Sequence, residues 1–379
     1  IGHYALVANT TGDRNVAVGA YALDANTTAN EGTAVGRDAL SANTTGEGNT
    51  GLGKAAMEDN TTGSYNVGVG LNALSNNTTA SDNTALGVNA LLVNTTGASN
   101  TAISRSALDA NTTGEFNAAL GKESLTANTT GDSNTGLGTF ALALNTTADN
   151  NTGVGYAALI ANTTGYGQTA LGQRAGQHAT TGAGNVFVGN EAGEDLTTGI
   201  GNTFVGYQTE SYAANSNYQI VMGFDTKSVG DAATFTFGRG TGNNRVHNNF
   251  DSNASFARVS DQRYKDEIQD NTDCGLDFIN ALRPITYKWR AKSDIDPSLP
   301  DYDAEATKRQ HDTKLYGLIA QEVKQALDDN GITDFGGWHQ EEDSGIQGIS
   351  QEMFVHPLIK AVQELSAKVE ELENKLNGE

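Results

Sequence analysis

The sequence predicts a mainly β protein: a β-solenoid shaft formed by three chains, a short β connector, and an α+β region that ends in a coiled-coil helix. Three observations predict this architecture. A 17-residue unit recurs through the first two hundred residues, a short stretch with alternating apolar residues follows, and the last third is charged and helix-forming. We place the shaft at 1–215, the connector at 216–259 and the C-terminal region at 260–379.

The composition limits the class of protein. The 379 residues include 45 glycines and only 37% hydrophobic residues, much of this share being Ala, so the first two thirds cannot build a thick core. The formal net charge of −22 argues against nucleic-acid binding and against charge-driven adhesion to anionic lipid. No apolar run approaches the roughly 18 residues of a membrane span, so we expect no membrane insertion. Because the chain begins inside a repeat, we expect the natural N-terminus to lie upstream.

The repeat decides the architecture of the shaft. The triplet Asn-Thr-Thr recurs every 17 residues without insertion, and degenerate copies continue to Thr198. Such a unit is too short for a helical hairpin and suits one coil of a β-solenoid, with a turn at its Asn-Thr-Thr-Gly corner. About twelve coils, at about 4.8 Å each, make a rod of roughly 55–60 Å. The triplet begins at Asn9, Asn26, Asn43, Asn60, Asn77, Asn94, Asn111, Asn128, Asn145 and Asn162.

Each unit has two sizeable apolar positions, which we expect to form stripes with ladders of Asn and Thr outside them. One or two aliphatic side chains per coil make a thin core, which favours the packing of three chains along one axis. The repeat resembles the short β-roll repeats of trimeric fibre and adhesin heads. The first position holds Val18, Val35, Leu52, Val69, Leu86, Ile103, Leu120, Leu137, Val154 and Leu171, and the second holds Leu23, Leu40, Met57, Leu74, Leu91, Leu108, Leu125, Leu142 and Leu159.

Other features of the first 259 residues allow more than one interpretation. Asn-Thr-Thr matches the N-glycosylation sequon, but a turn-and-ladder role explains ten identical copies without a sugar. Phe187 and Phe204 replace a small residue in the last repeats, so we expect these coils to cap or widen the solenoid. In the connector, alternation over 233–237 and Gly-Asn turns over 240–244 predict β-hairpins. The connector's aromatic residues are either core or a host-contact surface, and we favour core.

The C-terminal region carries four ordered segments that resemble one family. The hexapeptide 260–265 reads Ser-Asp-Gln-Arg-Tyr-Lys and resembles the S-D-x-R-x-K motif of the endosialidase-type intramolecular chaperone (peptidase S74) family. Supporting segments at 282–289, 316–323 and 356–365 resemble its L-x-P-x-x-Y-x-W segment, its G-x-I-A-Q-E-V helix and the opening of its terminal helix. The hexapeptide alone would be weak, but four segments in the expected order make the resemblance specific.

The resemblance implies a trimeric helper domain that aligns three chains, so that the upstream fibre folds in register, and then cuts itself off. The repeat creates a need for such alignment, because a ladder of near-identical units can slip by a whole unit and still satisfy its stripes. The terminal helix, 356–378, has a coiled-coil seam, although Val at a and Leu at d would alone favour two strands. Packing of this helix on its own domain is the alternative. The seam holds Leu358, Val362, Leu365, Val369, Leu372 and Leu376.

The implied chemistry is a single-turnover serine endopeptidase with a Ser-Lys dyad. By resemblance Ser260 is the nucleophile and Lys265 its general base. A free lysine, with a pKa near 10.4, is charged at neutral pH, so the dyad requires trimer assembly to bury Lys265 and lower its pKa. Asp261 and Arg263 would orient the turn. The bond that breaks is either Val259–Ser260 or Ser260–Asp261. The alternative interpretation is that Ser260 or Asp261 caps a nearby helix.

These features predict a subunit of a homotrimeric viral tail fibre, located in the virion, that attaches to a host cell-surface receptor such as a glycan or an outer-surface protein. Other tail or baseplate proteins would bind the part upstream of Ile1. Two alternatives stay open: a bacterial surface fibre or adhesin with the same module, and a tailspike that degrades surface glycan. We expect no nucleic-acid partner, no cofactor and no metal, because the six histidines lack metal-ligand spacing. Cys274 suits a small, semi-buried hydrophobic position.

Overall fold

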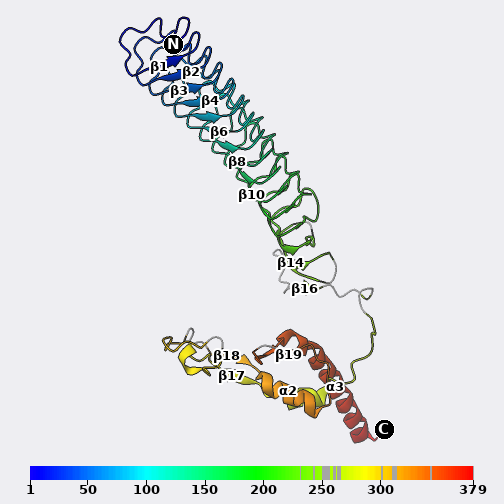
Figure 1. The fold of residues 1–379 in the computed structure, drawn as a ribbon. Helices are drawn as coiled ribbons and strands as arrows, with labels where there is room; N and C mark the ends of the chain where they lie inside the picture. The colour runs from blue at the N-terminus through cyan, green and yellow to red at the C-terminus, as the bar shows by residue number, and fades with distance from the viewer. Residues whose placement is uncertain are drawn as a thin grey trace. The chain divides into compact units, whose positions relative to one another are not determined.

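The computed structural model in Figure 1 describes residues 1–230, 232–241, 244–249, 257–258, 262, 266–299, 302–309, 314–341 and 344–378. The chain divides into two compact units, Ile1–Tyr264 and Lys265–Glu379. The first unit is a β-solenoid, and the second combines small sheets with helices. The predicted mainly β fold is therefore confirmed. The domain boundaries at 215 and 259 stay predictions.

The described part of the first unit forms one sheet in which every strand pairs with the next along the chain. Strands β1 to β13 pair in parallel with partners 17 residues apart, as in Thr33↔Thr50. The spacing persists to β13, although the triplet has ended by then, so the solenoid is slightly longer than the repeat predicts. The strands are β1 (Val16–Val18), β2 (Thr33–Val35), β3 (Thr50–Leu52), β4 (Val67–Val69), β5 (Thr84–Leu86), β6 (Thr101–Ile103), β7 (Ala118–Leu120), β8 (Thr135–Leu137), β9 (Thr152–Val154), β10 (Thr169–Leu171), β11 (Val186–Val188), β12 (Thr203–Val205), β13 (Ile220–Phe224), β14 (Thr234–Arg239), β15 (Arg245–Asn249) and β16 (Ala257–Arg258).

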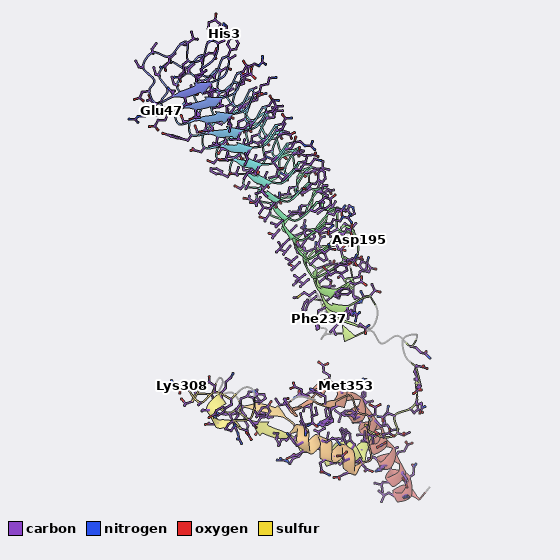
Figure 2. All side chains as sticks on the ribbon, in the orientation of Figure 1. His3, Glu47, Asp195, Phe237, Lys308 and Met353 are labelled. Atoms are coloured by element: carbon purple, nitrogen blue, oxygen red, sulfur yellow. The ribbon has the colours of Figure 1, made fainter. Side chains whose placement is uncertain are left out.

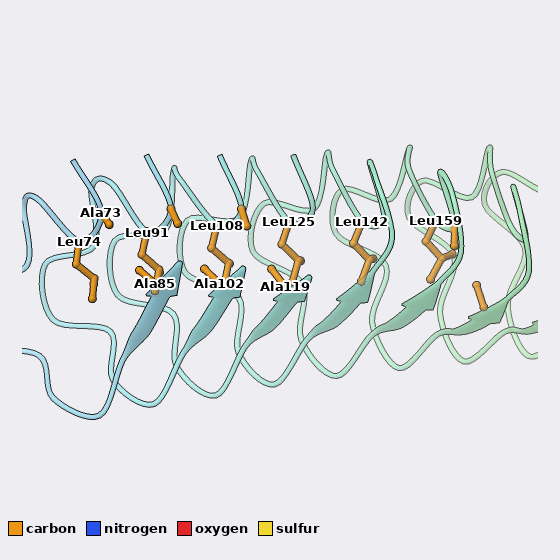
Figure 3. Close-up of a cluster of buried hydrophobic side chains, with 14 of the residues drawn as sticks. Ala73, Leu74, Ala85, Leu91, Ala102, Leu108, Ala119, Leu125, Leu142 and Leu159 are labelled. Atoms are coloured by element: carbon orange, nitrogen blue, oxygen red, sulfur yellow. The ribbon is translucent and has the colours of Figure 1, made fainter. Parts of the chain in front are cut away.

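The two apolar stripes lie on opposite sides of the coil wall. The second stripe is inside: Leu108 and its equivalents are fully buried and stack along the axis with small residues such as Ala102 (Figure 3). In each of the three-residue strands β1 to β12 the central Ala, Gly or Phe also points inward, so its two neighbours point outward. The first stripe therefore lies on the outer face of the sheet, where Leu120 is 50% exposed.

The asparagine ladders are inside the solenoid, and the expectation that they lie outside is wrong. Asn43 and Asn60 are at most 1% exposed. The amide of Asn43 donates to the carbonyl of Gly46 at 3.0 Å, and the amide of Asn60 donates to Oδ1 of Asn43 in the preceding coil at 2.8 Å. These amides close the corner of each coil and link neighbouring coils. A buried, hydrogen-bonded amide has no room for a sugar, which supports the turn-and-ladder role.

In two coils near the C-terminal end of the solenoid, a large residue replaces the small inward residue of the strand, and a glycine replaces the large residue of the corner. Phe187 and Phe204 occupy the inward strand position, and their rings stack with centroids 5.7 Å apart. Gly176 and Gly193 stand where the preceding coils have a buried Leu or, at Met57, a buried Met. A Cβ at Gly176 would lie 2.8 Å from the ring of Phe187. The rings fill the space that the missing leucines would occupy.

The connector continues the sheet and then turns back on itself. Strand β14 pairs in parallel with β13 and antiparallel with β15, which confirms the predicted hairpin. For the aromatic residues of the connector that the structure describes, the expectation that they form the core is wrong. Thr234 and Thr236 are buried, whereas Phe235 is half-buried and Phe237 is 40% exposed. Phe237 is labelled at the end of the solenoid in Figure 2. The parallel register places Thr236 beside the inward Val221. The hydroxyls of Ser228 and Thr234, 2.9 Å apart, satisfy each other in this interior.

The second unit is built around one small core. Phe278 packs at the centre, together with Val323, Leu327, Ile332 and Cys274. Burial raises the pKa of the Cys274 thiol, so this residue behaves as the small hydrophobe that the sequence predicts. The elements are α1 (Leu276–Ala281), β17 (Ile285–Tyr287), the 3₁₀ helix η2 (Lys292–Asp294), β18 (Leu315–Gly317), α2 (Ala320–Asp329), β19 (Trp338–Gln340), β20 (Gln347–Ile349), the 3₁₀ helix η3 (Gln351–Phe354) and α3 (Val355–Asn377).

Candidate processing site and assembly surfaces

The predicted cleavage chemistry falls on a segment outside the described residues. Val259, Ser260, Asp261, Arg263 and Lys265 all lie there, so their roles stay predictions. The elements on either side are described. The last strand of the solenoid sheet, β16, ends at Arg258 and pairs with β15 through Val246. Both candidate bonds therefore follow directly after the last strand, and a cut at either one leaves every described strand of the sheet on the solenoid side.

The described helices bear on the capping alternative. The first described α-helix after the candidate nucleophile is α1, which begins at Leu276 with Gly275 at its N-cap. This helix begins too far along the chain for Ser260 or Asp261 to cap it. An N-cap role for either residue on α1 is therefore excluded.

Two of the four predicted motif segments lie side by side. Segment 282–289 supplies β17 and segment 316–323 supplies β18, and the two strands pair antiparallel through Ile285↔Gly317. The Arg283 Nε donates to a carboxylate oxygen of Glu322 at 2.9 Å, which joins the two segments a second time. This hydrogen bond lowers the pKa of Glu322. Both side chains are largely exposed, so the pair contributes to orientation more than to stability.

The third supporting segment, 356–365, forms the start of α3, which contacts α1 and accepts a hydrogen bond from its first residue. Helices α1 and α3 pack against each other, and Ala361 of α3 is buried. The Glu364 carboxylate accepts the backbone N–H of Leu276 at 2.7 Å, in place of a side-chain cap on α1. A Cβ at Gly275 would lie 2.5 Å from the same carboxylate. The sequence contains no signal that pairs Gly275 with Glu364, because they are far apart in the chain.

The predicted seam of α3 faces away from its own domain. The buried residues of this helix are Pro357 and Ala361, which lie off the seam. The start of α3 packs on its own domain, as the alternative predicts, but the seam side chains stay exposed by about half or more. They are Leu358 (52%), Val362 (55%), Leu365 (51%), Val369 (47%), Leu372 (64%) and Leu376 (87%).

An open cavity of about 890 Å³ lies in the second unit. Its lining includes Trp289 from a predicted motif segment and the cationic side chains of Arg290, Lys292 and Lys308, without an acidic residue among the described lining. In a chain with a net charge of −22, this lining favours an anionic group. Sequence reasoning missed this cavity, because its cationic residues are spread over a long loop.

Comparison with known families identifies a domain that begins at the end of the first unit and continues into the second. Residues 260–332 match the family model Peptidase_S74, described as chaperone of endosialidase. The C-terminal part carries a chaperone-of-endosialidase domain. The match to this chaperone domain begins at the predicted nucleophile Ser260, covers α1, β17, β18 and α2, and ends before α3. No curated protein and no solved structure matches the chain. None of the described helices has the length and apolar character of a membrane span.

Proposed function

We propose that this chain is a subunit of a homotrimeric viral tail fibre that attaches to a host surface, and that its chaperone domain drives trimer folding and then cleaves itself off beside Ser260. One observation carries the proposal: a chaperone-of-endosialidase domain directly follows a long β-solenoid in the same chain. The family implies trimeric assembly, and the solenoid supplies the extended, repetitive shape of a fibre.

The thin core of the solenoid explains the need for a chaperone. Through most of the repeat, each coil buries one large aliphatic side chain such as Leu91, with two alanines or glycines beside it. Burial of one leucine contributes only about 1.5–3 kcal/mol, whereas ordering each residue costs about 1–2 kcal/mol. A single coil is therefore unstable by itself, and neighbouring coils must form together. Because one coil closely resembles the next, the chains need an external device that starts them at the same level.

The exposed seam of α3 supports trimeric assembly through the C-terminal region. Six apolar side chains form a continuous row along a helix whose other face is already attached to α1. Such a row is unfavourable in water and marks a helix–helix interface. Three copies of α3 that pack along this row would hold three chains at one level, which is the condition that a repetitive solenoid needs.

The proposed cleavage would release the finished fibre without damage. Because β16 ends at Arg258, either candidate bond lies beyond the last described hydrogen-bonded strand of the solenoid. The serine hydroxyl would attack the carbonyl carbon as Lys265 takes its proton, which forms an ester and frees the new amino terminus with a proton. Water would then hydrolyse the ester, which restores the serine hydroxyl and leaves a carboxylate at the end of the fibre. Since Lys265 is a base only when it is neutral, burial in the assembled trimer would couple cleavage to correct folding.

The proposal is tested by intact-mass analysis and denaturing gels of the wild-type chain, Ser260→Ala and the control Ser298→Ala, which removes an exposed hydroxyl elsewhere in the second unit. We expect the wild type and the control to split beside Ser260, and Ser260→Ala to stay whole. Native mass of Ser260→Ala should correspond to three chains. If all three proteins stay whole, autocleavage is wrong and the chaperone domain acts as a permanent clamp. A monomeric mass would contradict the fibre proposal itself.

A further inference from the structure

We infer that the outer face of the solenoid sheet is the surface along which three copies of this chain pack. The inference rests on the proposed homotrimer and adds the face through which the fibre shaft assembles. We define the outer face as the first and third residues of β1 to β13, which point away from the coil interior. Its two columns are mostly threonine in the first position and Val, Leu, Ile or Met in the third.

The outer face exposes apolar surface that a single chain does not bury. In the third-residue column, Leu86 is 46% exposed, Leu120 50% and Leu171 50%. The column begins at Val18 (39%) and ends at Met222 (42%) without a gap in the stacking. Contiguous apolar patches of more than a few hundred Å² are rare on soluble monomers and mark interfaces.

The outer face is also free of charge over its whole length. None of its 26 positions holds Asp, Glu, Lys or Arg, although these residues make up 18% of the chain. Charged residues of the same coils stand at its two edges instead, as Arg37 and Glu31 do beside β2. An uncharged apolar centre with a polar rim is the anatomy of a protein–protein interface.

The size of the outer face is sufficient for stable association. Thirteen strands spaced by about 4.8 Å make it about 60 Å long, and two side-chain columns about 7 Å apart make it over 10 Å wide. The resulting area, on the order of 700 Å², is close to the roughly 800 Å² that each partner contributes to a standard interface.

The repeat of the outer face identifies its partner as the same chain. Side chains recur along it at the strand spacing, so a partner that fits every coil must carry the same axial repeat. Phe235 and Phe237 of β14 continue its two columns beyond β13, because they pair with Ile220 and Met222.

Thiol cross-linking tests the inference with little disturbance of the fold. In a Cys274→Ala background, which removes the only cysteine of the chain, Leu120→Cys places a thiol on the outer face. Thr113→Cys places one on the exposed corner of the same coil. We expect a short three-armed maleimide to convert the Leu120→Cys protein into covalent trimers and to leave the Thr113→Cys protein as single labelled chains. A monofunctional maleimide should label the Leu120→Cys thiol more slowly.

Native mass separates failure of this inference from failure of the proposed function. If both variants are trimers but Leu120→Cys is not cross-linked, or if Thr113→Cys is cross-linked equally, the chains associate through another face and the inference is wrong. An antiparallel face-to-face dimer would give a two-chain mass without links at Leu120, which also overturns it. If the variants and the wild type are monomers, the proposed homotrimer fails, and the inference fails with it.

Discussion

At the residue scale, buried asparagines hold each coil to the next. An unsatisfied buried amide costs about 1–3 kcal/mol, so a ladder of them is stable only if every amide has a partner. The end of the ladder shows how this condition is met. After Asn162 the next two corner positions are the apolar Ala179 and Leu196, both fully buried. The longer side chain of Gln168 then reaches Oδ1 of Asn162 at 2.7 Å, so the last asparagine of this corner ladder keeps a hydrogen-bond donor.

One position per coil has a backbone conformation that favours glycine, and two opposite substitutions at this position test its effect on stability. The residue after each strand has φ near +140°, and it is Gly in every coil except at Ser104, where φ is +113°. We expect Ser104→Gly to stabilise the protein by about 1 kcal/mol by relief of strain. Gly87→Ala should destabilise it by about 1–3 kcal/mol, because its Cβ would lie 2.5 Å from the Ser104 carbonyl. Midpoints of denaturant unfolding measure both, and a less stable Ser104→Gly would contradict the strain argument.

At the element scale, two residues share the small interior of each coil. One comes from the strand and the other from the corner that follows it. In most coils a buried leucine faces an Ala or Gly of the strand, whereas in the last coils Phe187 and Phe204 face Gly176 and Gly193. Interiors of this density tolerate volume-conserving exchanges far better than single changes of size. The two arrangements are alternative solutions to the same volume.

This exchange predicts strong coupling between two positions. Phe187→Ala should cost about 3–5 kcal/mol because it leaves a cavity. Gly176→Leu should also destabilise, since the new side chain would meet the ring of Phe187. The double variant restores the Leu–Ala pair of the other coils, so we expect it to be more stable than either single variant. A double-mutant cycle on unfolding midpoints measures the coupling. Simple additivity would show that the two positions do not share one space.

At the scale of the whole molecule, the exposed seam of α3 predicts how assembly can be disrupted. In a Ser260→Ala background, which keeps the chaperone domain attached, Leu365→Asp should weaken the trimer because it places a charge in the seam. Ser366→Asp adds the same charge to an exposed residue off the seam and should leave the trimer intact. Native mass and the yield of soluble trimer measure both. Equal trimer yields from the two variants would exclude the seam as the contact between chains.

For the candidate site, also at the scale of the whole molecule, the sequence predicted the domain but not its internal contacts. The order of the motif segments predicted the chaperone domain, because four motif matches in the expected order rarely occur by chance. The contact of Glu364 with the start of α1, and the cationic cavity beside Trp289, were not predictable, because both depend on residues brought together only by the packing of the second unit. The roles of Ser260 and Lys265 stay predictions that the cleavage experiment decides.

The sequence by itself determined the coil length, the parallel in-register stacking and the chaperone domain that follows, because a strict 17-residue period permits one stacking of like on like. Only the tertiary structure decided which stripe lies inside. Strand alternation places neighbours such as Ala34 and Val35 on opposite faces without saying which face is the interior. The corner decides it: residues such as Leu40, at φ +53°, adopt a left-handed conformation that β propensities do not predict. This conformation turns the leucine into the coil, so only a small residue fits opposite it, and the larger aliphatic side chains must face outward.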